Sequence, residues 1–444
     1  MNNIHFLTQF SKEIFNASQK FTTRLHKPQQ GNFRELVRGM AVSGSVYLSH
    51  IARCNSTLGN TRKDVERLSR TLETIPALKF TEVHINSQIP KYKNETVLLL
   101  SDGGDLQKPY AKEMEKLCKT VDGSNGHCVG RGYPLESLVA YGVESKTITP
   151  LAMHLYSTED ENFYSVWDEH QKVFKLCDSF VQSSIKSRIV IEDRGCDDEK
   201  RFVYFSNDMK CGFVTRVNTG TKARKMIIID EDGNHIERSI QSLALQLRDK
   251  AGNERTWKNK KIKRELISSI AYQKVYLPKH LDIPLTAIFV YSEGYKDPLV
   301  VLTNLITEDA KDAWKNFFYY KKRWEVENFY RSVKQNFSAE SFLILSFKKI
   351  QALAFMLMFI SSFIMNIKNK TTEFFGTLSY LVKDFCKQTQ RTGEHHLDIL
   401  AFLREYIPIV AHDYSYRFCS LCISKNRYTI NKNQLKLFDF RKNW

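Results

Sequence analysis

The stretch from Phe317 to Phe337, FFYYKKRWEVENFYRSVKQNF, carries four kinds of polar side chain at helical spacing. On an α-helix that turns by about 100° per residue, Tyr320, Arg323, Glu327 and Lys334 fall within an arc of about 60°. Glu327 could hold a divalent cation on that face, while the two basic groups neutralise phosphate oxygens. The alternative is a solvated helix face whose side chains form weak charge pairs.

The other side of the same helix is apolar, which predicts how it is anchored. A contiguous stripe suited to packing on a core is formed by Val326, Phe329, Tyr330, Val333 and Phe337. Glu325 lies about 160° away from Glu327 around the helix axis. Only Glu327 is therefore expected to join the polar cluster.

The pattern Tyr320-x-x-Arg323-x-x-x-Glu327, followed by Lys334, resembles the Tyr-Arg-Glu-Lys signature of DDE transposases. These enzymes come from bacterial insertion sequences, and the spacing is that of the insertion sequence four family. The resemblance implies an α/β fold with a ribonuclease H-like catalytic core. It also implies an enzyme that binds the ends of its element, cleaves them and joins the 3′-hydroxyl ends to target DNA.

Two short apolar runs each lead directly into an aspartate. NETVLLLS, at 94–101, precedes Asp102, and SRIVIE, at 187–192, precedes Asp193. Both runs have the length and composition of buried strands. Open α/β sheets place ligand sites at the carboxyl ends of their strands, so these strands predict a carboxylate site. Alternatively, Asp102 only starts a turn, because Asp and Gly favour turns.

The resemblance assigns roles to these acids. Asp102 corresponds to the first catalytic aspartate, with Asp105 as the alternative, and Asp193 begins an Asp-Arg-Gly triplet typical of the second. Together with Glu327 they would bind two Mg²⁺ ions, which Mn²⁺ can replace, for in-line attack on phosphodiester bonds. The residues expected to contact DNA phosphates are Tyr320, Arg323, Lys334 and Arg194.

Further segments fit the order of a ribonuclease H-like fold. A hairpin is predicted from 132–142 and 146–156, a helix from 161–182, and short strands at 202–205 and 212–218. The long stretch between Asp193 and Glu327 needs folded structure of its own. It is predicted to be a β-rich insertion containing KMIIID, SLALQLRD, SIAYQKVYLP, LTAIFVYSEG and PLVVLTNL.

The resulting domain scheme has four parts. An N-terminal helical domain either binds DNA or only packs on the core, and the C-terminal helical region supports a homodimer and DNA contacts. The predicted boundaries are 1–85 for the N-terminal domain, 90–218 and 299–345 for the catalytic core, 219–298 for the insertion and 346–444 for the C-terminal region.

Composition points to a polyanionic partner. The 444 residues carry a formal charge of +17, which favours a nucleic acid as the partner over a ribosomal or membrane surface. The resemblance implies that this nucleic acid is double-stranded DNA. Nine unevenly spaced cysteines favour a reducing compartment, and the N-terminus lacks a secretory signal, so a cytoplasmic protein is expected. The apolar segment 350–367 is long enough to span a membrane, but its polar interruptions favour a buried core helix.

Some predictions leave alternatives open. The basic run between Lys258 and Arg264 contacts DNA backbone or forms a solvated loop, and Trp257 beside it packs in the core or stacks on a base. Other classes of protein also fit parts of the pattern. They are a nuclease of the same fold that does not join strands, a DNA-binding protein whose catalysis has decayed, and a membrane protein.

Overall fold

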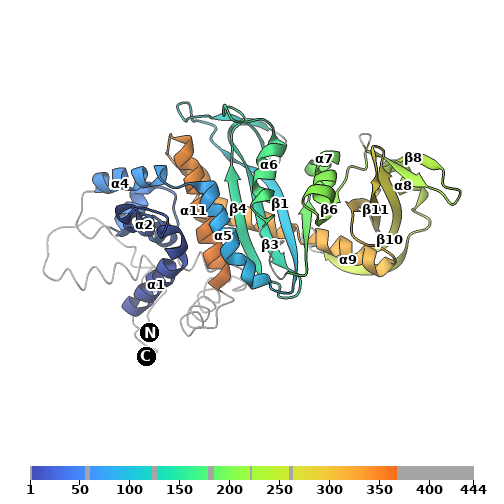
Figure 1. Ribbon diagram of the computed structural model, residues 1–444, viewed down its shortest axis with the longest axis horizontal. Coiled ribbons are helices and arrows are strands. Elements are labelled where there is room, and N and C mark those ends of the chain that lie inside the picture. Colours follow the sequence, from blue (N-terminus) through green and yellow to red (C-terminus); the bar gives the residue numbers. More distant parts are fainter. Residues whose placement is uncertain are drawn as a thin grey trace.

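The computed structural model describes residues 3–55, 61–122, 128–178, 185–220, 223–259 and 264–367. The N-terminal part is helical as predicted, and its helices gather at one end of the molecule (Figure 1). They are α1 (Asn3–Thr22), α2 (Lys27–Ser43), α3 (Leu48–Asn55), α4 (Thr61–Glu73) and α5 (Ala77–Gln88), followed by the short η1 (Ile89–Tyr92).

A mixed sheet follows the helices. Its first strands are β1 (Thr96–Gln107), β2 (Cys118–Asp122), β3 (Cys128–Gly142), β4 (Ile148–Leu155), β5 (Ser187–Glu192) and β6 (Gly212–Arg216). β3 and β4 form the predicted hairpin, β1 is antiparallel to β3, and β5 runs parallel to both β1 and β6. The order β4-β3-β1-β5-β6 is compatible with the ribonuclease H-like fold implied by the resemblance.

Successive residues of the central strands enter two different cores. Leu98 and Leu100 of β1 pack with residues of the helices on the front face, among them α10 (Trp324–Phe337) and α11 (Phe347–Ile367). Val97 and Leu99 pack on the rear face with α6 (Val166–Lys175) and α7 (Glu199–Val203). This alternation follows from the pleat of a strand, whose side chains point to opposite faces in turn.

The sheet continues beyond β6 into the region predicted as an insertion. β12 (Leu299–Thr303) pairs with β6 on one side and with β11 (His280–Ser292) on the other. Within the described residues the strands form one twelve-stranded sheet. The remaining strands are β7 (Lys225–Ile229), β8 (His235–Ser239), β9 (Gly252–Asn259) and β10 (Arg264–Leu277).

Two segments predicted as strands are helical. The segment 202–205 lies in α7 and the π-helical turn η4 (Tyr204–Asp208), and Asp198 caps α7 by accepting a hydrogen bond from the backbone of Lys200. SLALQLRD contributes to α8 (Ile240–Gln246), which is capped by Ser239. Both predictions were wrong because a short apolar run fits a strand and a buried helical turn equally well.

The segment Phe317–Phe337 is not one uninterrupted helix. α9 (Ala310–Lys321) ends before Lys322, and α10 starts at Trp324. At the junction the backbone NH groups of Arg323 and Val326 bond to the carbonyls three residues before them. Such steps turn the chain by about 120° per residue instead of 100°. Side chains of α10 are therefore rotated about the helix axis from the directions that one continuous α-helix would give them.

The apolar helix α11 lies between the N-terminal helices and the sheet (Figure 1). Its length and composition would suffice to cross a membrane, but 83% of its apolar window is buried inside the protein. The prediction of a core helix is therefore confirmed, and this packing is consistent with a soluble protein. Trp257 also packs in the core, since its ring meets Phe317 and its NH group donates to Ser268 at 2.9 Å.

Several predictions fall on parts of the chain outside the described residues. They are the centre of the basic run (260–263), the end of the helix predicted at 161–182, and the C-terminal region from 368 onward. The helix within 161–182 is seen as α6, from Val166 to Lys175.

Candidate active site

The two central parallel strands bring the predicted aspartates to one place. Leu100 of β1 pairs with Ile191 of β5, and the parallel pairing ends there. Asp102 and Asp193 each stand two residues farther on, so the pleat points both to the same face. Asp193 follows the end of β5, as predicted. Asp102 does not end its strand, because β1 continues along β3 as far as Gln107.

Arg323 links these aspartates to the third predicted acid. Its guanidinium lies 3.6 Å from the carboxylate of Asp102 and 3.7 Å from that of Asp193. It also donates a hydrogen bond to Glu327, one turn farther along α10. The structure therefore gathers Asp102, Asp193 and Glu327 around one guanidinium. Glu325 is not among its contacts, and its carboxylate accepts a bond from Asn328 instead.

Two further side chains hold Asp193. The Tyr320 hydroxyl at the end of α9 donates to its carboxylate at 2.9 Å. Arg216, the last residue of β6, places its guanidinium 3.9 Å from the same carboxylate. Arg216 was not predicted as a site residue. The sequence did not single it out, because the strand was predicted to run on to residue 218 and its pairing with β5 is seen only in the structure.

The cluster has an excess of negative charge in a partly buried position. Burial raises the pKa of Asp102 to about 7, with Arg323 opposing the shift and the charges of Glu327 and Asp193 adding to it. For Asp193 burial is outweighed, chiefly by Arg323, and the pKa lies below its usual value. Burial opposes the charge of Arg323, but the surrounding acids raise its pKa above the ordinary range.

Tyr330 fixes α10 against β1. Its hydroxyl donates to the backbone carbonyl of Asp102 at 3.1 Å. Its ring lies so close to Gly104 that a Cβ on that glycine would be 2.8 Å from the phenol carbon and oxygen. The missing side chain at Gly104 therefore allows the helix that bears Glu327 to approach the strand that bears Asp102.

Lys334 does not reach the three acids. Its ammonium lies 3.4 Å from Asp105 and 2.9 Å from Glu340, at the far end of α10. The buried ammonium of Lys108 completes this second group by donating to the backbone carbonyl of Glu340 at 2.8 Å. Asp105, the alternative first acid, therefore belongs to the Lys334 group. Arg194 is exposed directly after Asp193.

The donor set suits a divalent cation. Three carboxylates supply the oxygen ligands that Mg²⁺ and Mn²⁺ prefer. Burial is the main cause of the raised pKa of Asp102, and the charges of Glu327 and Asp193 add to it, so a cation bound beside this carboxyl would favour its ionised form. In the described part of the chain, no three His, Cys, Asp or Glu side chains converge closely enough to ligate one ion. Since Arg323 lies between the acids, it would have to turn away before they could hold a metal.

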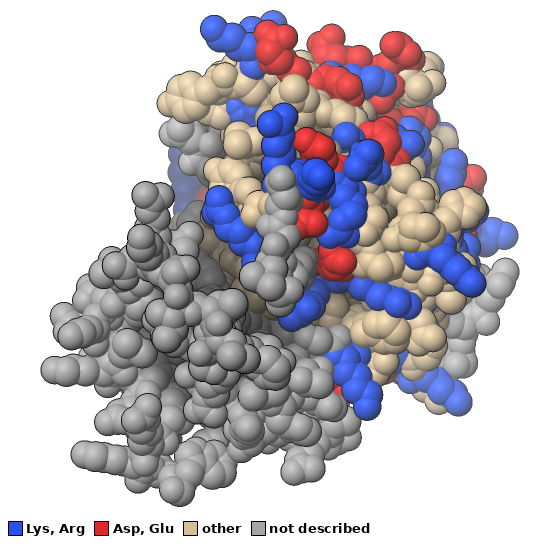
Figure 2. Space-filling model, turned by 90° about the vertical axis from the view of Figure 1, so that its left-hand side faces the viewer, with Lys and Arg blue, Asp and Glu red and all other residues tan. Residues whose placement is uncertain are grey.

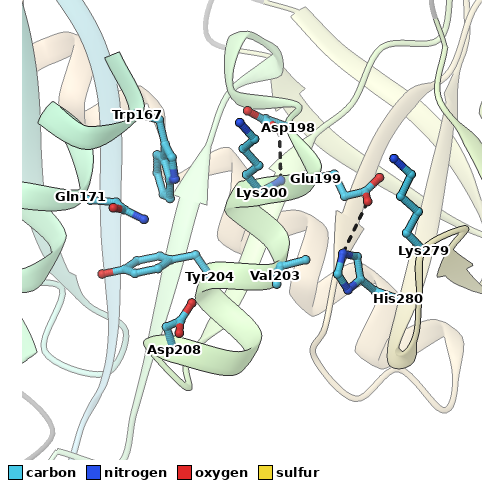
Figure 3. A pocket seen from close by; sticks show the side chains of 10 residues that line it. All are labelled: Trp167, Gln171, Asp198, Glu199, Lys200, Val203, Tyr204, Asp208, Lys279 and His280. Carbon is cyan, nitrogen blue, oxygen red and sulfur yellow. Dashed lines mark hydrogen bonds and ion pairs between the residues drawn. The ribbon is translucent and has the colours of Figure 1, made fainter. Parts of the chain in front are cut away.

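A separate pocket lies between α6, α7 and the turn before β11, on the face of the sheet that these two helices cover (Figure 3). Its volume is about 530 Å³. Trp167 and Tyr204 form its aromatic side, and Glu199 lies 3.6 Å from His280 across it. None of the three acids of the cluster lines this pocket, so it is distinct from the candidate active site.

Comparison with known proteins gives one family. The family described as "Transposase DDE domain" matches residues 141–363, which is half of the chain. The matched span contains Asp193, Arg323 and Glu327, and it begins after Asp102. No curated protein matches the chain.

Proposed function

The chain belongs to the family of transposases with a DDE domain, and from this premise we propose that it moves a bacterial insertion sequence of the insertion sequence four type. In this proposal it binds the ends of the element, cleaves them, and joins their 3′-hydroxyl groups to target DNA. The observation that supports it most is the gathering of Asp102, Asp193 and Glu327 around Arg323. These acids come from three distant parts of the chain.

We assign cation binding to Asp102, Asp193 and Glu327, with Asp102 preferred to Asp105 because only Asp102 contacts Arg323. Two bound Mg²⁺ ions would neutralise charge on the attacking and leaving oxygens of an in-line displacement. The protein orients these acids through other residues. Tyr320 fixes the carboxylate of Asp193, and Tyr330 holds the backbone at Asp102.

Arg323 has two successive partners in this proposal. In the protein alone it pairs with the three acids, and on the DNA complex it turns toward a phosphate of the element end. Arg guanidinium groups suit both partners, since they bind carboxylates and phosphates in the same forked geometry. We also assign phosphate contacts to the exposed Arg194 and to Lys334, whose ammonium pairs with Asp105 and Glu340 in the protein alone.

The N-terminal helices are our candidate for recognising the element ends. Figure 2 shows that Lys and Arg side chains are spread over the described part of this end of the molecule, whereas acidic ones are most frequent near its upper edge, with some among the basic groups. Exposed lysines and arginines of α2 to α4 are Lys27, Arg38, Arg53, Arg62, Lys63 and Arg70. Such side chains release counterions from DNA and so supply affinity. A homodimer would pair two ends, and the cytoplasm of a bacterium is the matching compartment.

The test uses the purified chain, DNA carrying the ends of its element, and a supercoiled target. We expect nicking at the ends and joined products with Mg²⁺, and neither with EDTA. Cleavage without joined products would indicate a nuclease of the same fold. Binding without cleavage in both Mg²⁺ and Mn²⁺ would indicate a protein that has lost catalysis.

A further inference from the structure

The rear face of the sheet, behind the carboxylate cluster, carries a chain of polar side chains. Ser101 of β1 donates a hydrogen bond to Glu136 of β3, whose other oxygen lies 3.2 Å from Nε2 of His170 on α6. Nδ1 of His170 is 2.6 Å from the guanidinium of Arg201 on α7, which also donates to Glu192 of β5. All five residues are at most 6% exposed.

The two end members of this series of polar side chains are sequence neighbours of the two aspartates, which lie on the opposite face of the sheet. Ser101 directly precedes Asp102, and Glu192 directly precedes Asp193. Because neighbouring residues of a strand point to opposite faces, each pair has one member in the rear chain and one in the carboxylate cluster. A displacement of Ser101 or Glu192 therefore displaces an acid on the other side of the sheet.

The contacts determine the protonation of the ring at the centre of the chain. Arg201 can only donate, so Nδ1 of His170 must accept. Burial, with the nearby Arg201 charge, lowers the pKa of His170 to about 3, so the ring is neutral and carries its proton on Nε2. Glu136 Oε2 lies 3.2 Å from that nitrogen. Neither atom has an aligned hydrogen bond to any described residue, so each is the available partner of the other.

Burying such a chain is costly compared with an apolar core of the same volume. An ion pair taken out of water loses much of its hydration, and well-packed hydrophobic residues often stabilise a fold as well or better. Buried hydrogen bonds and close polar contacts do, however, restrict the distances and directions between the groups that they join. This series of side chains joins β1 to β5, the two strands that carry Asp102 and Asp193. Its rigidity would therefore fix the separation of these strands.

We propose that Ser101, Glu136, His170, Arg201 and Glu192 form a positioning network, the rear brace, which sets the spacing of β1 and β5 and thereby the separation of Asp102 and Asp193. This inference rests on the proposed function, because it concerns how well the acids are placed to hold cations. In the described part of the chain none of the five side chains forms a hydrogen bond or ion pair with the three acids, so the brace acts through the strands. The charge of Glu136 is in addition within electrostatic reach of Asp102.

His170 offers a matched set of variants. In His170→Gln the amide oxygen can still accept from Arg201 and the amide NH can still donate to Glu136. His170→Leu removes both contacts. The control is His154→Leu, because His154 is a buried histidine that bonds Glu169 at 2.8 Å but does not connect the two strands. Glu169 keeps its pair with Lys172 in that control.

The decisive measurement is the Mn²⁺ concentration that half-saturates end cleavage by the full-length chain. Loss of a residue that orients metal ligands typically weakens metal binding by about 10 to 100-fold. We expect a rise of about tenfold or more for His170→Leu, and no comparable rise for His170→Gln or His154→Leu. An unchanged value for His170→Leu, or an equal rise in the control, would overturn the brace. If His170→Leu does not fold, Ser101→Ala takes its place. Its half-saturating Mn²⁺ concentration should rise by less than that expected for His170→Leu, and an unchanged value would overturn the brace.

Hydrogen exchange of the protein without DNA or metal separates this inference from the proposed function. Peptides covering 96–107 and 187–196 should exchange faster in His170→Leu than in the wild type or in His154→Leu. If the wild type cuts no DNA but this difference is seen, the proposed function fails and the brace stands. If the wild type cuts and joins DNA while exchange and Mn²⁺ dependence are unchanged in His170→Leu, only the brace fails.

Discussion

Replacing Arg323 by glutamine should make Mg²⁺ bind more tightly to the protein in the absence of DNA. In the wild type a cation competes with the guanidinium for the same three acids. The variant keeps a polar side chain of similar length but removes this competing charge. It should also destabilise the metal-free protein, because three neighbouring carboxylates lose their shared counter-charge.

The size of the effect follows from the exposure of the groups. The Arg323 side chain is 14% exposed, and the three acids are 22 to 34% exposed. Surface ion pairs contribute at most about 1 kcal/mol, and breaking a buried pair costs about 3 to 5 kcal/mol. An intermediate value of about 2 kcal/mol corresponds to about thirtyfold in Mg²⁺ affinity.

The assay is thermal unfolding during a titration with Mg²⁺, since a ligand of the native state raises its stability. Arg323→Gln should begin below the wild type and gain more stability as Mg²⁺ is added. Arg331→Gln is the control, because Arg331 is exposed on the same helix and packs over Trp324 instead of an acid. If Mg²⁺ stabilises Arg323→Gln no more than the wild type, Arg323 does not compete with the cation.

Three other perturbations test separate parts of the structure. Glu327→Gln should abolish cleavage and leave end binding intact, whereas Glu325→Gln should cleave nearly normally; equal losses in a cleavage assay would contradict the assignment. Gly104→Ala places a methyl group 2.8 Å from the tyrosine ring above it and should cost about 1 to 3 kcal/mol in denaturant unfolding. Gly103→Ala, whose nearest contact is at 3.8 Å, should be nearly neutral. Burial raises the pKa of Glu136 to about 8, so its contribution to stability is present at low pH and is lost as the pH rises toward 8. Glu136→Gln should lack this dependence, and identical pH profiles would count against it.

The sequence was most informative where the same residues both form a local pattern and must be buried in the folded protein. The centre of SRIVIE, residues 189–191, is apolar because both faces of β5 are covered, and this short apolar run made both the strand and the position of Asp193 predictable. The helical spacing of Tyr320, Arg323 and Glu327 also predicted side chains that meet. Lys334 shares this face of the helix but does not meet the three acids, because it lies seven residues, or about 10 Å, beyond Glu327 along α10 and pairs with Asp105 and Glu340.

The rest depends on contacts that no local pattern reveals. Arg323 was predicted to face phosphate, but its partners in the protein alone are acids from β1, β5 and α10. His170 and Arg201 gave no sequence signal, since an isolated histidine or arginine in a helix has many possible partners. The extension of the main sheet through β12 was also hidden, because strand pairing over long separations is not encoded in the strands themselves.

The two faces of the sheet also constrain the register of β5. A slip of one residue would exchange Glu192 and Asp193 between the faces. Glu192 would then lose Arg201 on the rear side, and Asp193 would take its place in a buried network that it is too short to complete. On the front, a longer acid would stand against Tyr320 and Arg323. The same rear contacts that set the spacing of the strands thus also select the register in which Asp193, and not Glu192, faces Glu327.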